Sequence, residues 1–113
     1  MGAERRRFLR ATQPFDAHCR LREVGSLWIS VAVLNLSASG VRFRNELPFD
    51  LGAEMELKFQ PTGFSKPLVV RGRVVWHEMQ ASGVVEHGIE LWGLSPEQQQ
   101  RIDSLVRFLQ QHA

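Results

Sequence analysis

Hydrophobic and polar residues alternate along most of the chain with the two-residue period of a β-strand. In residues 53–60, AEMELKFQ, every second position from Ala53 to Phe59 is apolar, and the positions between them are charged or amide residues. Six β-like segments, separated by turn-forming sequences, fall at residues 15–23, 27–37, 40–45, 53–60, 68–78 and 84–94. Because no helical period interrupts them, the pattern predicts an all-β fold, either an antiparallel sandwich or a small barrel.

Residues 95–112 change to the period of an α-helix. Ser95 stands at an N-cap position, Pro96 at the first helical position, and Gln98 three residues after the cap, which is a typical helix start. Four apolar residues follow at i, i+3, i+4 and i+7 and form one stripe: Ile102, Leu105, Val106 and Leu109. We therefore expect a six-stranded antiparallel β-barrel on which a C-terminal helix docks through this stripe.

The chain has the length and composition of one ordinary domain, with 113 residues, 43% of them hydrophobic and 23% charged. We divide residues 1–113 into an N-terminal arm at 1–13, a barrel at 14–94 and the helix at 95–112. The arm has no clean period, so we expect it to be flexible and to become ordered on binding.

Positive charge is concentrated in the arm, where Arg5, Arg6, Arg7 and Arg10 fall within six residues. The first 22 residues carry a net charge of +4, the other 91 carry −2, and the chain has twelve arginines but two lysines. Charge alone is compatible with a solvated tail, a nucleic-acid contact, a membrane contact or a clamp for a small anion. The strong preference for arginine favours bidentate recognition of phosphate by a planar guanidinium group.

Cysteine usage and hydropathy limit the location of the protein. The single Cys19 excludes an intramolecular disulfide and favours a reducing, cytoplasmic location. No apolar run approaches the roughly 18 residues of a membrane span. The arginines near the N-terminus are not followed by the apolar segment of a signal peptide, so we expect no membrane partner.

The sequence offers little support for catalysis or metal binding. No nucleophile elbow, P-loop or HExxH motif is present. His18 and Cys19 are strand neighbours, whose side chains point to opposite faces, so we expect Cys19 to be a small buried thiol. His87 shares a strand face with Ile89 and Leu91, which predicts a partly buried structural histidine. We expect no enzyme activity, no metal and no cofactor.

A polar motif, NLSASG at residues 35–40, ends a long apolar segment. Asn35 and Ser37 are two residues apart on a strand, so their side chains should project from the same face. Gly40 lacks a Cβ, so it can adopt a positive φ and another group can approach its backbone closely. Taken alone, the motif is a weak signal, and an ordinary turn between two strands is the preferred interpretation.

The two motifs in this order, on this strand pattern, resemble the PilZ domain family. The family signature is RxxxR in an N-terminal arm, matched by Arg6 and Arg10, followed by [D/N]xSxxG on the barrel, matched by Asn35, Ser37 and Gly40. The resemblance covers essentially the whole chain, including GVRF after the second motif and HGIEL in the last strand. It implies a non-enzymatic bacterial receptor for the second messenger cyclic di-GMP.

The resemblance also implies roles for the motif residues. Arg6 and Arg10 would bind phosphate and guanine, Asn35 and Ser37 the guanine edge or the ribose-phosphate ring, and Gly40 would allow close approach. The chemistry agrees independently, because guanine O6 and N7 suit a bidentate arginine and its flat face can stack on a guanidinium.

Two positions bear on how the ligand would bind. Arg5 directly precedes the RxxxR motif, and in this family an arginine there goes with an intercalated dimer of cyclic di-GMP. Asn35 stands where the family allows Asp or Asn, and an amide does not accept from the guanine N1–H and N2–H groups as a carboxylate does.

Three further residues have two interpretations each. Trp76 is either a packing residue or an aromatic wall against a guanine or an arm arginine. Arg42 and Arg44 either extend the basic surface or pair with Glu54 and Glu56 across strands. Trp28 and Trp92 have no motif support, and we expect them to be packing residues.

Two other functions remain open at this point. The first is a PilZ-like interaction module that no longer binds nucleotide. The second is a small nucleic-acid-binding barrel, which the acidic barrel and the absence of tyrosine disfavour. In the preferred interpretation, ordering of the arm transmits the signal to a separate effector protein, which the sequence does not identify.

Overall fold

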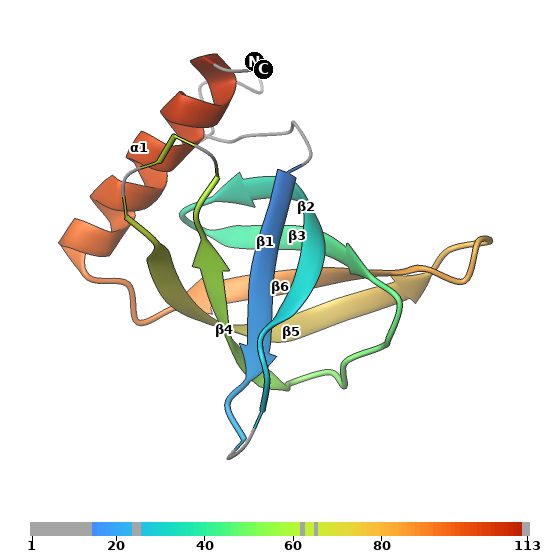
Figure 1. Cartoon of the computed structure of the whole chain (residues 1–113). Helices are drawn as coiled ribbons and strands as arrows, with labels where there is room; N and C mark the ends of the chain where they lie inside the picture. The colour runs from blue at the N-terminus through green and yellow to red at the C-terminus, as the bar shows by residue number, and fades with distance from the viewer. Residues whose placement is uncertain (1–14, 24–25, 62, 65, 112–113) are drawn as a thin grey trace, which may run out of the picture.

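The fold consists of six strands followed by one helix (Figure 1). The computed structural model of the chain describes residues 15–23, 26–61, 63–64 and 66–111. The elements are β1 (Phe15–Leu21), β2 (Ile29–Ser37), β3 (Gly40–Asn45), β4 (Glu54–Phe59), β5 (Leu68–Met79), β6 (Val85–Trp92) and α1 (Pro96–Gln111). The predicted arm, residues 1–13, lies outside the described residues.

The strands form a closed barrel in the order β1-β2-β3-β6-β5-β4, and every pairing is antiparallel. Closure pairs β1 with β4, so the sheet leaves no long unpaired edge. The predicted antiparallel barrel with a C-terminal helix is therefore confirmed. The order also places β3 against β6, two strands that are far apart in the sequence.

The barrel interior is filled by the apolar positions of the alternating pattern. Phe43, Met55, Leu57 and Phe59 are completely buried. Each such side chain stabilises the fold by roughly 1.5–3 kcal/mol relative to an exposed one. Cys19 is also buried, as predicted, and burial raises the pKa of its thiol to about 12, so the thiol stays protonated.

Helix α1 begins with the predicted capping box. The Ser95 hydroxyl accepts a hydrogen bond from the Gln98 backbone N–H at 3.0 Å, and the Gln98 side chain accepts one from the Ser95 N–H at 2.9 Å. The helix packs against β2 and β5 and lies to one side of the barrel (Figure 1). The predicted stripe is the buried face of the helix: Ile102, Leu105, Val106 and Leu109.

Two strands are interrupted by shifts of register. One shift lies between Val33 and Asn35 in β2, and the other between Val74 and Trp76 in β5. Each shift changes which side chains face outward beyond it. Gly72 lies inside β5, where a glycine is typical of a bulge or of a close approach by another group. It is in regular register, and a Cβ there would lie 2.5 Å from a methyl carbon of Ile89, so close approach explains this glycine. The irregularity comes later in β5.

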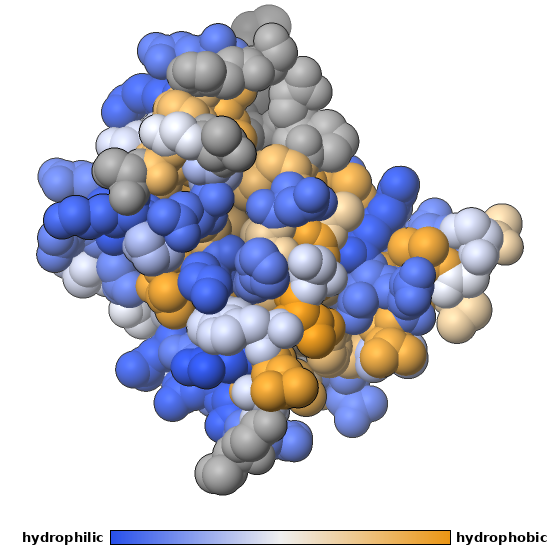
Figure 2. Space-filling model, in the orientation of Figure 1, coloured by the Kyte–Doolittle hydropathy of each residue, from blue (hydrophilic) through white to orange (hydrophobic). Residues whose placement is uncertain are grey.

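The surface carries apolar residues in separated patches among hydrophilic ones (Figure 2). Within the described residues, no helix is both long enough and apolar enough to cross a bilayer.

Candidate functional site

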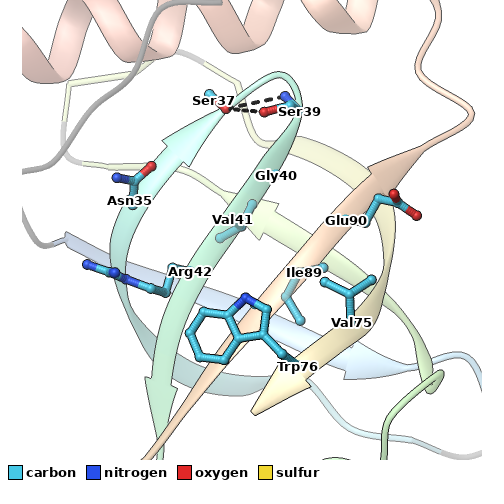
Figure 3. Close-up of a pocket in the computed structure, with 11 residues that line it drawn as sticks. Asn35, Ser37, Ser39, Gly40, Val41, Arg42, Val75, Trp76, Ile89 and Glu90 are labelled. Atoms are coloured by element: carbon cyan, nitrogen blue, oxygen red, sulfur yellow. Dashed lines mark hydrogen bonds between the residues drawn. The ribbon is translucent and has the colours of Figure 1, made fainter. Parts of the chain in front are cut away.

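A shallow hollow of about 350 Å³ lies on the outer wall of the barrel, over β2, β3, β6 and β5 (Figure 3). Asn35, Ser37 and Gly40 of the predicted motif all line it, as does Trp76. The structure therefore brings the barrel part of the candidate site together. Arg5, Arg6 and Arg10 lie outside the described residues, so their roles stay predictions.

The first row of the hollow crosses four strands. Asn35 on β2 pairs with Arg42 on β3, Arg42 pairs with Gly88 on β6, and Gly88 pairs with Trp76 on β5. Residues opposite each other in an antiparallel pair project on the same side of the sheet. An amide, a guanidinium and an indole thus share one line across the outer wall.

The second row runs beside the first. Ser37 pairs with Gly40, Gly40 with Glu90, and Glu90 with Arg73. Arg73 donates two hydrogen bonds to one carboxylate oxygen of Glu90, at 2.9 and 3.1 Å. Each row has a glycine at an inner position, so at these two points no side chain projects from the wall.

Gly88 gives Trp76 its place on the wall. A Cβ at Gly88 would overlap the indole nitrogen of Trp76, so the ring can lie against the β6 backbone only because residue 88 is glycine. Trp76 is 40% exposed, and Figure 3 shows its indole lying across β6. Trp76 is therefore not a core residue: its ring packs on the sheet face and also lines the hollow, and its contact with a guanine or an arm arginine stays a prediction.

Gly40 is required by close packing and not by its backbone angle. A Cβ there would lie 2.7 Å from the backbone oxygen of Ile89, far inside van der Waals contact. Among the described residues, the positive-φ glycines are Gly52, Gly63, Gly83 and Gly93. Gly40 therefore does not use the positive φ that is open to a glycine, whereas the close approach of another group to its backbone is confirmed.

The hydroxyl groups of the motif hold the β2–β3 turn. Ser37 is 3% exposed, and its Oγ lies 2.8 Å from the Oγ of Ser39. The same Ser37 oxygen accepts a hydrogen bond from the Ser39 backbone N–H at 3.3 Å. Ser39 is exposed, so it is the hydroxyl more open to a ligand.

The arginines of β3 pair with an acidic residue of β6. Arg44 donates two hydrogen bonds to one oxygen of Glu86, at 3.1 and 3.2 Å, and the Arg42 Nε lies 3.8 Å from the other oxygen. The alternative of pairing with Glu54 and Glu56 is wrong, because those residues lie on β4, which neighbours β1 and β5 in the barrel. The structure leaves Arg42 in the hollow, whereas Arg44 is not among its lining residues.

A buried histidine lies behind the hollow. His87 is completely buried and its Nε2 accepts a hydrogen bond from the Phe49 backbone N–H at 3.0 Å. Burial, with a smaller contribution from the charge of His77, lowers the pKa of His87 below its usual value, so the ring is neutral near pH 7. The predicted structural histidine is confirmed. Within the described residues, no three His, Cys, Asp or Glu side chains gather in a way that could hold a metal ion.

Two other tryptophans differ in their surroundings. Trp28 is half-buried and is in cation–π contact with two cations, the Arg20 guanidinium at 4.4 Å and the Lys58 ammonium at 4.5 Å from the ring centroid. Trp92 is 36% exposed, with Arg71 at 5.7 Å. Neither residue is among those lining the hollow.

Three residues that line the hollow were not predicted from the sequence: Gly88, Glu90 and Ser39. Gly88 and Glu90 belong to the HGIEL segment, and Ser39 stands inside NLSASG, so a signal for each was present. What the sequence did not supply was the pairing of β3 with β6, which brings the HGIEL segment beside the motif.

Solved structures share this architecture at low sequence identity. The inhibitor of motility MotI/DgrA from Bacillus subtilis is 18% identical with a TM-score of 0.73, and the match covers 96% of this chain and 52% of that one. The chain thus spans about half the length of the Bacillus protein. The PilZ domain of YcgR from Escherichia coli, solved with c-di-GMP, is 12% identical with a TM-score of 0.74, and the match covers 96% and 93% of the two chains.

A third structure, the PilZ domain of CeSA from a cellulose-synthesizing bacterium, is 16% identical with a TM-score of 0.67, and the match covers 89% of this chain and 97% of that one. Comparison with curated protein sequences gives no significant match. The family model described as PilZ domain matches residues 4–108, nearly the whole chain. The resemblance inferred from the two motifs is therefore confirmed, and the chain belongs to the PilZ domain family.

Proposed function

We propose that the protein is a receptor for cyclic di-GMP and that the nucleotide binds over the hollow on the outer wall of the barrel. The observation that carries the proposal is the meeting of Asn35, Ser37, Gly40 and Trp76 in that hollow. Support comes from the family and from two similar structures, the YcgR PilZ domain and YcgR, that were solved with c-di-GMP.

The hollow suits a guanine base. The exposed face of the Trp76 indole offers a stacking surface, and the Asn35 amide offers both a donor and an acceptor to the edge of the base. Because Ser37 already bonds to Ser39, we assign it mainly to holding the turn, with Ser39 presenting the free edge of the pair. Base stacking on an aromatic residue contributes roughly 1–3 kcal/mol.

The arm is attached where its arginines can reach the hollow. Phe15, the first residue of β1, pairs with Val33 of β2, which precedes Asn35 by two residues. The five residues from Arg10 to Phe15 can span at most about 17 Å, and the nine from Arg6 about 30 Å. The four inter-strand steps from β1 to β5 amount to about 19 Å. Arg10 can therefore reach the β2 side of the hollow, and Arg6 the Trp76 side.

Calorimetric titration of the folded protein with cyclic di-GMP tests the proposal. We expect saturable binding, and loss of most of the affinity in Arg6→Ala and in Arg10→Ala. Arg7→Ala, which removes a neighbouring charge outside the RxxxR spacing, is the matched control and should bind nearly as the wild type does. A few charge-assisted hydrogen bonds are enough for micromolar affinity, so binding should be detectable at tens of micromolar cyclic di-GMP. If the folded protein releases no heat of binding at that concentration, the proposal is contradicted.

Such a result with an intact fold would favour an interaction module that has no nucleotide ligand. A nucleic-acid-binding barrel is less favoured, because residues 23–113 carry a net charge of −2, whereas affinity for a nucleic acid depends on many cationic contacts to phosphates.

The same proposal covers stoichiometry and output. Arg5 provides the extra cation for an intercalated cyclic di-GMP dimer, and the titration measures the number of ligands bound per chain. The protein acts without catalysis, in the cytoplasm of a bacterium. Closure of the arm over the ligand changes the surface that a separate effector protein contacts.

A further inference from the structure

We propose that Arg42 is a ligand-binding arginine supplied by the barrel wall itself, in addition to the arginines of the arm. This inference rests on the proposed function, because it names a further contact of the same site. Arg42 belongs to neither signature motif. Its place is set by strand pairing, which puts it between Asn35 and Gly88 in the first row of the hollow.

The surroundings of Arg42 leave its side chain open toward the hollow. Gly88, its neighbour on β6, has no side chain that could cover or pair with it. On the other side, Figure 3 shows the Arg42 side chain extending across β2 near Asn35. The side chain is 48% exposed. The guanidinium is thus held at the edge of the hollow without being covered.

The hydrogen-bonding capacity of Arg42 is unused within the described residues. Glu86 directs one oxygen to Arg44, and its other oxygen lies 3.8 Å from the Arg42 Nε, beyond hydrogen-bond length. Within the described part of the chain, the Arg42 side chain has this long ion pair and no hydrogen bond, although a guanidinium has five N–H donors. Arg44, two residues away on the same strand face, instead donates two hydrogen bonds to the Glu86 carboxylate.

These observations point to an anionic or acceptor-rich partner. A guanidinium binds two oxygens of a phosphodiester, or O6 and N7 of guanine, in the same forked geometry. Both acceptor sets belong to cyclic di-GMP. Because Arg42 is fixed on a strand, it would engage the ligand with less ordering cost than an arginine of a flexible segment.

The test compares two arginines that differ in position but not in kind. Arg42→Ala and Arg44→Ala each remove one guanidinium from the same face of β3 beside Glu86. In titrations with cyclic di-GMP we expect Arg42→Ala to weaken binding about 10- to 100-fold, as for loss of hydrogen bonds to a charged group. Arg44→Ala should stay within about twofold of the wild type, and Arg42→Lys should fall between wild type and Arg42→Ala, since it keeps the charge without the fork.

Thermal unfolding of each variant without ligand checks that it is folded, which we expect because both side chains are about half exposed. If the wild type binds and the two alanine variants bind equally well, the assignment of Arg42 is overturned while the proposed function stands. If the folded wild type shows no binding, the proposed function fails and the assignment fails with it.

Discussion

At the scale of the residue, the shape of the hollow depends on two glycines. Gly40 lets the β6 backbone approach β3, and Gly88 leaves room for the Trp76 indole. The sequence motif indicated the first glycine but not the second. The reason for a glycine is clear only when the residue beside it in the fold is known. For Gly88 that residue is Trp76 of β5, which strand pairing brings next to it.

Gly88→Ala tests whether this glycine positions the indole. The added methyl group would overlap the Trp76 ring, which is partly exposed and can therefore rotate outward. We expect the variant to fold with a stability loss of about 1–3 kcal/mol or less. Its affinity for cyclic di-GMP, measured by titration, should fall about as far as in Trp76→Ala, where loss of stacking costs roughly 1–3 kcal/mol.

The double variant Gly88→Ala, Trp76→Ala separates this role from a direct one. If Gly88 acts through the indole, the double variant should bind no more weakly than Trp76→Ala alone, because the two effects are not additive. Additive losses would show instead that the methyl group blocks the ligand directly.

At the scale of the element, Phe49 is one of the residues that tie the connection between β3 and β4 to the barrel. Phe49 donates its backbone N–H to His87 at 3.0 Å, and its carbonyl accepts a hydrogen bond from the Nδ1 of His77 at 3.0 Å. The Phe49 ring also packs on His87, with centroids 5.2 Å apart. This attachment uses His87 as an acceptor, which an imidazolium cannot be.

The tie predicts a pH dependence of stability. Since burial lowers the pKa of His87 in the folded state, the unfolded state binds the proton more readily. The stabilisation is therefore complete above the unfolded pKa, near 6.5, and is lost as the pH falls from there through the lower folded pKa. Each pH unit in that window costs at most about 1.4 kcal/mol.

Denaturant unfolding between pH 5 and 7.5 measures this loss. His87→Gln keeps an acceptor but does not titrate, so its stability should change less across the range than that of the wild type. His18→Gln removes a histidine of β1 that lies away from Phe49, and it should keep the wild-type dependence. A parallel dependence in the wild type and in His87→Gln would refute the role of His87.

The elements themselves were largely predictable from the sequence. The alternating pattern, with one long apolar segment at residues 27–37, located the strands, and the capping residues located the helix, because these signals depend on neighbours a few residues apart. The register shift after Val74 was not predicted, although it sets the outward direction of Trp76. Gly72 of the same strand is regularly paired, which shows that a glycine in a strand does not by itself identify a bulge.

At the scale of the whole molecule, closure of the barrel decides which residues meet. Local patterns predicted six strands but not their order, so Arg42 and Arg44 were assigned acidic partners on β4 as one alternative. The closed order gives them Glu86 on β6, and it joins the NLSASG turn to the HGIEL strand in one hollow. The NLSASG motif is thus visible in a short stretch of sequence, but the barrel part of the site forms only when distant strands pair.

In the proposed receptor, cyclic di-GMP contacts both the barrel wall and the arm. Thermal unfolding can measure how much this binding stabilises the folded protein. A ligand that binds only the folded state at 100 times its Kd stabilises it by about 2.7 kcal/mol. For a domain of this size, each kcal/mol of added unfolding free energy raises the Tm by about 4 °C, so we expect cyclic di-GMP to raise the Tm by about 10 °C. The double variant Arg6→Ala, Arg10→Ala should have the wild-type Tm without ligand and a much smaller rise at the same ligand concentration. If its rise equals that of the wild type, the barrel wall binds the nucleotide without the arm, and signalling through arm closure would have to be abandoned.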